Sequence, residues 1–446
     1  MINAWASRPP RDDETTTPKR YLGGDVAGGR RAPNHTIHRV GAAGTLTVFA
    51  HAPSPSRSSL TGRFSMTLSG QFSPPPRQSV VYGKPIAQAL PAELDKLGAS
   101  RVVLVTTHSL SAPGALAASV QAALGARCLE VVTGIGAHSP RGDVLRIVAA
   151  LRKHKADAVV GFGGGSVCDA TKVATQCLTN NVQSAADLDP LRVPSTAPGP
   201  VLPYIMIPTT LSAGEFTHFA GVTDERGPRK ELYLHPDLAP NVVILDPALT
   251  LATPPRLWFS TGIRAVDHAV ESWCSINVTP PVEATSLHAL RLLPEGLRGC
   301  LKNPQDLDMR LQCQLGSWLS IQGVSTMVDL GASHGIGHVL GGTAGMPHGE
   351  TSCVMLPHVL RYNLDVTRER QRLLSQAMGA PDRAAADVVA QLVADLGLPG
   401  RLRDAKVPRE LLPRIAEEAM HDLWVKTNPR PISGPPVVLE LLEAAW

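Results

Sequence analysis

The sequence predicts an α/β domain with a mostly parallel sheet, followed by an all-helical domain. From residue 79 to residue 162, apolar strand-like runs alternate with helix-like segments, a pattern typical of a parallel sheet covered by helices on both faces. After residue 250 the apolar residues recur at the 3.6-residue period of helices, with little strand signal. We therefore expect the first domain to cover residues 76–249 and the second to cover residues 250–446.

The individual elements follow from the apolar runs and their flanks. In the first domain we expect strands over residues 80–83, 101–106, 128–133 and 158–162, and helices over 91–97, 112–125 and 142–154. In the second domain, residues 282–293 and 384–396 have helical spacing.

Residues 1–75 differ from the rest of the chain. They are rich in Pro, Ser, Arg, Gly and Thr and have almost no periodicity, which predicts a disordered tail. Met66 is a plausible shorter start, so the tail is alternatively an over-extended start.

Composition narrows the class of protein. The formal net charge of +4 comes from scattered basic residues, which favours a soluble enzyme over a nucleic-acid-binding protein. No apolar run approaches the roughly 18 to 20 residues that a membrane helix needs, and no signal-peptide segment follows the N-terminus. The 7 cysteines form no CxxC pair, as expected for reduced thiols. We expect a cytoplasmic enzyme with a small-molecule substrate, bound neither to nucleic acid nor to a membrane.

A glycine-rich turn, Gly163-Gly164-Gly165-Ser166, follows the strand over 158–162 and opens a helix-like segment at 167–176. Glycines let the backbone approach a pyrophosphate, and a helix N-terminus supplies free N–H donors. Close packing of helix on strand explains such a turn about as often. The position of this turn after a strand favours phosphate binding.

A second strand end carries hydroxyl groups. Thr209, Thr210 and Leu211 follow Ile207-Pro208, and the hydroxyls are suited to bind phosphate, ribose or nicotinamide. The alternative is a threonine-rich loop that caps the next element. Because ligands of parallel sheets bind outside the carboxyl ends of the strands, the two motifs together predict a nucleotide site.

Four histidines form a candidate metal or proton-transfer site. His334 and His338 are four residues apart, His348 follows, and His268 shares a helix face with Arg264. Such spacing suits a metal or a proton relay, although a lone histidine is more often a hydrogen-bonded core residue. A carboxylate at position 264 would complete a metal site, but Arg264 is a permanent cation and repels a metal ion.

These residues resemble the iron-containing (group III) alcohol dehydrogenase family, which has a dehydroquinate synthase-like fold with a Rossmann-like nucleotide-binding domain. The resemblance covers about 79–446 and is most similar to the maleylacetate reductase branch. The segments that carry it are the glycine turn with Asp169 and Lys172, the threonine loop with Glu215, and residues 262–271, 334–363 and 428–432.

The resemblance implies a homodimer that uses NADH or NADPH to reduce an unsaturated keto-diacid from the breakdown of aromatic compounds by hydride transfer. Thr107 lies where many NAD-preferring relatives have an aspartate, and the loss of that charge permits NADPH. The implied cofactor-binding residues are Gly163, Gly164, Gly165, Ser166, Asp169, Lys172, Thr209, Thr210, Leu211 and Thr107.

The family's metal, iron or zinc, would be held by an aspartate at position 264 and by His268, His334 and His348, with His338 near the nicotinamide. Because position 264 is an arginine, the resemblance leaves the metal open. Asp267 is a possible substitute ligand, but it is rotated by about 100° around the helix from His268.

We hypothesise that Arg264 binds a substrate carboxylate or the developing enolate oxygen, since a guanidinium forms bidentate contacts with such groups. His268, His334, His338 or His348 would then supply the proton. Three other functions compete. They are a metal-dependent alcohol dehydrogenase or aldehyde reductase, a dehydroquinate synthase-like lyase, and a catalytically inactive binding or assembly protein.

Overall fold

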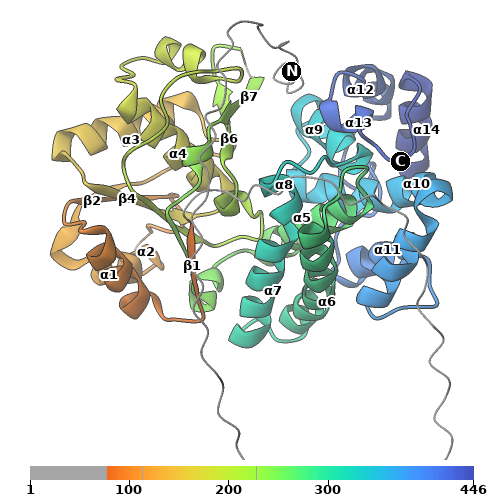
Figure 1. The fold of residues 1–446 in the computed structure, drawn as a ribbon, viewed down its shortest axis with the longest axis horizontal. Helices are drawn as coiled ribbons and strands as arrows, with labels where there is room; N and C mark the ends of the chain where they lie inside the picture. The colour runs from red at the N-terminus through yellow and green to blue at the C-terminus, as the bar shows by residue number, and fades with distance from the viewer. Residues whose placement is uncertain (1–77, 113, 228) are drawn as a thin grey trace, which may run out of the picture. The chain divides into compact units, whose positions relative to one another are not determined.

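The computed structural model describes residues 78–446, except 113 and 228. The expected disorder of residues 1–75 lies outside the described residues. In the described part, a parallel six-stranded sheet with helices on both faces is followed by a helical region (Figure 1). This arrangement confirms the predicted fold class.

The sheet has the strand order β1-β8-β5-β4-β2-β3, and all of its neighbouring strands run parallel. Its strands β2 and β4 match the predicted runs 101–106 and 158–162 almost residue for residue. The strands are β1 (Ser79–Tyr82), β2 (Val102–Thr106), β3 (Cys128–Val132), β4 (Ala158–Gly163), β5 (Tyr204–Pro208) and β8 (Val242–Leu245).

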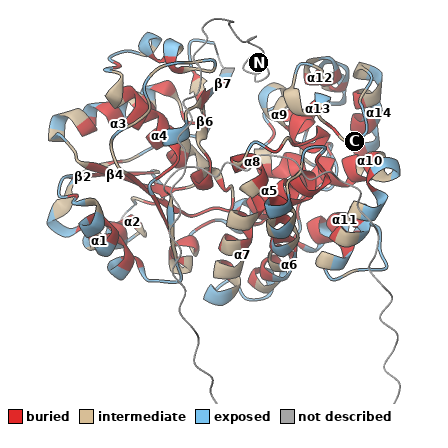
Figure 2. Cartoon of the chain, in the orientation of Figure 1, coloured by how far each residue is buried: buried red, intermediate tan, exposed pale blue. Residues whose placement is uncertain are grey.

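Alternating side chains of the strands build two separate cores. Val103 and Val159 pack with α3 (Arg141–His154) and α4 (Gly165–Thr179) on one face. Leu104 and Val160 pack with α1 (Ile86–Leu97) and α2 (Ala117–Leu124) on the other. Strand side chains alternate between the two faces of a sheet, so the continuously apolar strands contribute side chains to both cores. Figure 2 shows these strands as buried.

Two of the predicted helices have different bounds. α1 begins at Ile86 instead of 91, because the carboxylate of Asp246 accepts a hydrogen bond from the backbone N–H of Ile86 at 2.7 Å and caps the helix there. α2 begins at Ala117 instead of 112, after Gly114 adopts a left-handed conformation with φ of 80°.

One further sheet was not predicted. Strands β6 (Phe219–Asp224) and β7 (Arg229–Leu234) pair antiparallel as a two-stranded ribbon. Asp169, near the start of α4, accepts the backbone N–H of Gly221 at 3.1 Å, which ties this ribbon to the glycine-rich turn.

The helical region surrounds α5, the helix that carries Arg264 and His268. The predicted helical stretch 282–293 lies entirely within α6, and 384–396 extends one residue beyond α11 at each end. The helices are α5 (Pro255–Cys274), α6 (Pro280–Lys302), α7 (Leu307–Ser320), α8 (Gln322–Ser325), α9 (Ala332–Ala344), α10 (His348–Ala377), α11 (Ala385–Asp395), α12 (Leu412–Ala419), α13 (Leu423–Lys426) and α14 (Pro435–Ala445).

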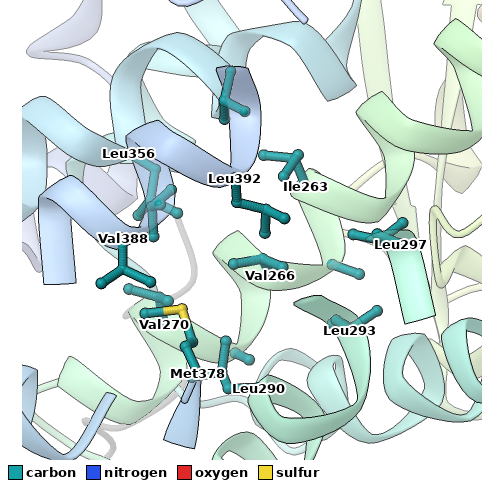
Figure 3. Packing of buried hydrophobic residues seen from close by; sticks show 14 of the residues in the cluster. Ile263, Val266, Val270, Leu290, Leu293, Leu297, Leu356, Met378, Val388 and Leu392 are labelled. Atoms are coloured by element: carbon teal, nitrogen blue, oxygen red, sulfur yellow. The ribbon is translucent and has the colours of Figure 1, made fainter. Parts of the chain in front are cut away.

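The core of this region orients α5. Ile263, Val266 and Val270 of α5 pack against leucines of α6 and against Leu356 and Leu392 of α10 and α11 (Figure 3). Residues 264, 267, 268 and 271 therefore lie on the other faces of α5, where polar side chains gather. Within the described part of the chain, no helix combines the length and the apolarity required to span a membrane.

Hydrogen bonds join the sheet to the helical region at the loop after β5. The N–H of Leu211 donates to Thr261 Oγ1 at 3.1 Å, and its C=O accepts from Ser317 Oγ at 3.0 Å. Thr253 Oγ1 donates to the C=O of Thr209 at 2.6 Å. These bonds fix the loop that follows β5 against α5 and α7.

Candidate active site

The four predicted histidines lie together, on three helices that meet beside Arg264. The ring centroids of His268 and His334 are 5.0 Å apart, and those of His338 and His348 are 6.2 Å apart. His138, from the loop before α3, extends the group with its ring 6.3 Å from that of His348. Sequence reasoning brought the four helical-region histidines together correctly, although it missed His138.

Two glycines permit this close approach of the helices. A Cβ atom at Gly349 would lie 2.7 Å from the carbonyl carbon of Ser260 in α5. A Cβ at Gly337 would lie 2.8 Å from Thr351 Oγ1 and 3.7 Å from Nη1 of Arg264. Real Cβ atoms do not tolerate contacts below 3 Å, so these positions need glycine for α9 and α10 to reach α5.

Glu271 fixes the start of α9. Its carboxylate accepts the backbone N–H groups of Gly331, Ser333 and His334 at 3.1, 2.9 and 3.2 Å, and it lies 2.8 Å from His334 Nδ1. Asp267 accepts a hydrogen bond from Ser333 Oγ at 2.7 Å. A carboxylate at a helix N-terminus satisfies free N–H groups, so these two acids position His334.

Burial changes the acid–base properties of this network. It raises the pKa of Asp267 to about 6, and together with the neighbouring Asp267 it raises the pKa of Glu271 to about 8. Burial also holds the pKa values of His268, His334 and His348 well below their usual range, and the charge of Arg264 lowers them further. Near neutral pH these three imidazoles are therefore uncharged.

Arg264 is a cation without a carboxylate partner. Its Nη1 donates to Ser352 Oγ at 3.1 Å, and among the described residues no carboxylate oxygen lies within 4 Å of its guanidinium nitrogens. Desolvation lowers its pKa from the usual value, while Asp267, Glu271 and Asp422 act in the opposite direction through their charges. A guanidinium has five N–H donors, so Arg264 keeps donors for an anionic ligand.

His338 differs from the other three helical-region histidines. Its Nδ1 lies 2.9 Å from Asp422 Oδ2, and its side chain is 38% exposed, whereas that of His334 is 1% exposed. Trp424 packs beside both rings, with centroid distances of 5.0 Å to His338 and 5.7 Å to His334.

Arg264 counts against a metal ion held by His268, His334 and His348, although one ring nitrogen of each of these histidines is buried without a hydrogen-bond partner among the described residues. Within residues 78–446, the donor atoms that converge near these histidines belong to Asp267, Glu271 and His334. Those acids already accept hydrogen bonds from backbone N–H groups, Ser333 and His334. The positive charge of Arg264 faces the same histidines, and it would repel a divalent cation.

The glycine-rich turn retains the features that suit phosphate binding. Gly163 adopts φ of 157°, and Gly164 is the N-cap residue of α4, which has no side-chain cap. A Cβ at Gly164 would lie 3.0 Å from Thr210 Cγ2, so the two predicted motifs are in contact. Ser166 Oγ accepts the backbone N–H of His138 at 3.1 Å, which links the turn to the histidine group.

Three predicted cofactor residues have structural partners instead. Lys172 Nζ donates to the carbonyls of Gly214, Thr217 and Phe219 at 2.6, 2.8 and 3.0 Å. Leu211 is fully buried in the core around α5, and both of its backbone polar groups are paired. Asp169 holds the β6–β7 ribbon, as described above.

Thr107 and the threonine loop lie at strand ends, as predicted. Thr107 follows β2, and its Oγ1 lies 3.1 Å from Ser109 Oγ. Thr209 and Thr210 follow β5 and are buried, with Thr210 Oγ1 3.1 Å from Ser212 Oγ. Sequence reasoning missed Ser352 and Asp422, since nothing in the local pattern marks partners that lie 88 positions from Arg264 and 84 positions from His338.

A glycine-rich turn at the carboxyl end of a strand in a parallel sheet is the arrangement of a nucleotide-binding protein, and the buried histidines beside it are suited to acid–base chemistry. Family models agree with this class. The model for iron-containing alcohol dehydrogenases matches residues 76–247, and the C-terminal model of the same family matches residues 258–446. The chain therefore belongs to the iron-containing alcohol dehydrogenase family and is an oxidoreductase.

Individual relatives in this family carry different names. The chain is 32% identical to dehydrogenase FUM7 of Gibberella moniliformis, over 82% of this chain and 96% of that one. It is 31% identical to lactaldehyde reductase of Escherichia coli strain K12, over 82% and 97% of the two chains. The solved structure of maleylacetate reductase from Rhizobium sp. strain MTP-10005 has a TM-score of 0.71 at 28% identity, covering 85% of this chain and 99% of that one.

Proposed function

We propose that this oxidoreductase uses NADH or NADPH to reduce an unsaturated keto-diacid, as the name maleylacetate reductase of one structural relative describes. Hydride from the nicotinamide would add to the alkene carbon β to the keto group. The electron pair of the double bond would move to the keto oxygen as an enolate, and a proton would then be added at the α carbon.

The observation that carries this proposal is the position of Arg264. It lies among four histidines, and within the described residues it has one hydrogen bond, to Ser352, and no ion-pair partner. A charge-assisted hydrogen bond to an arginine contributes about 1.5 to 3 kcal/mol. Because the negative charge of the reaction develops on the enolate oxygen, a fixed guanidinium would stabilise the transition state without a metal.

The proton is best supplied by His338. His268 and His334 are buried, and Nδ1 of His334 is hydrogen-bonded to Glu271. His338 is 38% exposed, so that it can recover its proton from water, and it has the carboxylate of Asp422 as a partner. This partner orients the ring, which favours His338 as the proton donor of the enolate.

The cofactor would lie along the glycine-rich turn, with its phosphates at the N-terminus of α4. Gly163, Gly164, Gly165 and Ser166 contribute the backbone there, and Thr210 lies in contact with the turn. Thr107 follows β2, where a carboxylate would repel the 2′-phosphate of NADPH. Threonine has no such charge. We therefore expect both NADH and NADPH to bind.

The test of this proposal is a substrate comparison. Purified protein with NADH or NADPH is assayed with maleylacetate, its mono-amide and lactaldehyde. Preference for the diacid by at least about tenfold, lost in Arg264→Gln but kept in Arg256→Gln, would support it. Arg256 is on the same helix and forms an ion pair with Glu350. Equal turnover of lactaldehyde and the diacid would contradict the proposal.

A second candidate is a reductase of simple aldehydes, which the identity to lactaldehyde reductase favours. It would not need the charge at position 264, so Arg264→Gln would leave its rate with lactaldehyde unchanged. A lyase of the dehydroquinate synthase type is less well supported, since it would need a metal ion that the positive charge of Arg264 repels.

A further inference from the structure

Asp422 is the carboxylate that contacts His338, and its own position is fixed by the backbone. Its Oδ1 accepts the N–H of Trp424 at 2.8 Å and caps α13, while its Oδ2 lies 2.9 Å from His338 Nδ1. Both carboxylate oxygens are therefore occupied. The orientation of the imidazole ring follows from the start of a helix rather than from a flexible side chain.

Packing holds this pair in place. α13 lies beside α9 (Figure 1), and Gly335 of α9 faces the cap. A Cβ at Gly335 would lie 2.8 Å from the backbone nitrogen of Val425 and 3.0 Å from Asp422 Oδ1. The indole of Trp424 packs against the His338 ring at 35°. The ring is thus restrained on one side by Trp424 and at Nδ1 by Asp422.

The hydrogen bond also determines which nitrogen of His338 is free. A carboxylate accepts and cannot donate, so in the neutral imidazole the proton must be on Nδ1. Nε2 then has the lone pair, and in the imidazolium it has the proton that can be transferred. The centroid of the His338 ring is 6.2 Å from that of His348, which places the ring at the histidine group beside Arg264.

We propose that Asp422 is a positioning residue, which holds His338 with its N–H at Nδ1 and leaves Nε2 to exchange the proton of the reaction. This inference rests on the proposed function, in which His338 donates that proton to the α carbon of the enolate. The imidazolium loses the Nε2 proton and becomes neutral imidazole, while the Nδ1 proton stays on the ring in the hydrogen bond to Asp422. Water then restores the proton through the exposed side of the ring.

The first measurement is independent of turnover. Nitrogen-15 NMR of the neutral His338 ring, assigned by comparison with His338→Gln, should show the proton on Nδ1 in the natural protein. In Asp422→Asn the amide can turn its NH₂ toward Nδ1, and the proton should move to Nε2. A neutral ring with its proton on Nε2 in the natural protein would overturn the proposal, whatever the substrate is.

The second measurement separates positioning from stability. Asparagine caps helices about as well as aspartate, so Asp422→Asn should keep the melting temperature of the natural protein. Its kcat with maleylacetate should fall by about 10²-fold, the usual size of a general-acid contribution, while the KM for NADH stays within twofold. The matched control is Asp306→Asn, which alters the equivalent cap of α7 and should leave kcat unchanged.

A double variant tests whether Asp422 acts through His338. His338→Gln combined with Asp422→Asn should be no slower than His338→Gln alone, because the positioned ring is already absent. If the two losses multiply, or if Asp422→Asn keeps the natural kcat, the proposal fails. If maleylacetate is not reduced at all, the proposed function fails, but the NMR result still decides the role of Asp422.

Discussion

Nη1 of Arg264 donates a hydrogen bond to Oγ of Ser352 at 3.1 Å, across the contact between α5 and α10. Burial raises the pKa of Asp267, and the charge of Arg264 on the same helix acts in the opposite direction. Ser352 therefore holds the guanidinium through a neutral hydrogen bond, and no ion pair holds it among the described residues. The cation is held in place while its remaining donors stay available.

Ser352→Ala should weaken substrate binding without removing the charge. Losing one neutral hydrogen bond costs about 1 kcal/mol, so the KM for maleylacetate should rise about fivefold, while the KM for NADH is unchanged. Steady-state kinetics measures both constants. The control is Ser375→Ala, a buried serine of the same helix that bonds the Gln371 carbonyl. An equal effect in the control would mean that the change acts through the helix and not through Arg264.

Gly337→Ala should disturb the site by steric contact. The added Cβ would lie 2.8 Å from Thr351 Oγ1, so α9 and α10 must separate, at a cost of about 1 to 3 kcal/mol. Gly342→Ala is the matched control, because nothing lies within 4 Å of a Cβ there. Thermal melting and kcat should fall in the first variant only. Adding Thr351→Ala should recover part of both, and no recovery would argue against this contact as the cause.

Lys172→Met should destabilise the protein and leave its affinity for NADH unchanged. The ammonium bonds three backbone carbonyls and Thr217 Oγ1, and buried acceptors left unpaired cost about 1 to 3 kcal/mol each. We expect a large loss in melting temperature, while the folded protein binds NADH within threefold of normal, measured by fluorescence titration. The exposed Lys153→Met serves as a control. A tenfold weaker NADH affinity at unchanged stability would mean that Lys172 binds the cofactor after all.

Glu215→Gln should change how stability depends on pH. Burial raises the pKa of Glu215 to about 7 from its ordinary 4.5, and the nearby Asp169 acts in the same direction. Its folded-state pKa is raised, so its contribution to stability is complete below about pH 4.5 and is lost as pH rises through about 7, by about 1.4 kcal/mol per unit. Urea unfolding at pH 5 and pH 7 should show a smaller decline for the glutamine variant. Parallel declines would contradict this assignment.

The sequence predicted the sheet well because its strands are buried on both faces. The runs at β2 and β4 are continuously apolar, because a strand that is buried on both faces needs apolar side chains at every position. The β6–β7 ribbon was missed because Gly221 and charged residues interrupt its apolar side chains, so that no continuous apolar run marks its two strands. Its position depends on Asp169 and Lys172, which are distant in the chain.

The candidate site could be predicted only in part. Helical spacing indicated that Arg264 and His268 share a face, and the Gly-rich turns around His334 and His348 suggested close approach. The partners of these residues could not be predicted, because Ser352 and Asp422 contact them across the fold rather than along one helix. Whether Lys172 faces the cofactor or the protein likewise depends on a side-chain direction that spacing does not determine.

The central claim about this enzyme is that it reduces its substrate without a metal, assisted by Arg264. The direct measurement is the rate of NADH oxidation with maleylacetate after exhaustive chelation, repeated with added iron, zinc or manganese, for the natural protein and for Arg264→Asp. We predict full turnover in the chelated natural protein, no gain from any metal, and at least a hundredfold loss in Arg264→Asp. Turnover that appears only when a metal is added, or that survives in Arg264→Asp, would contradict the account.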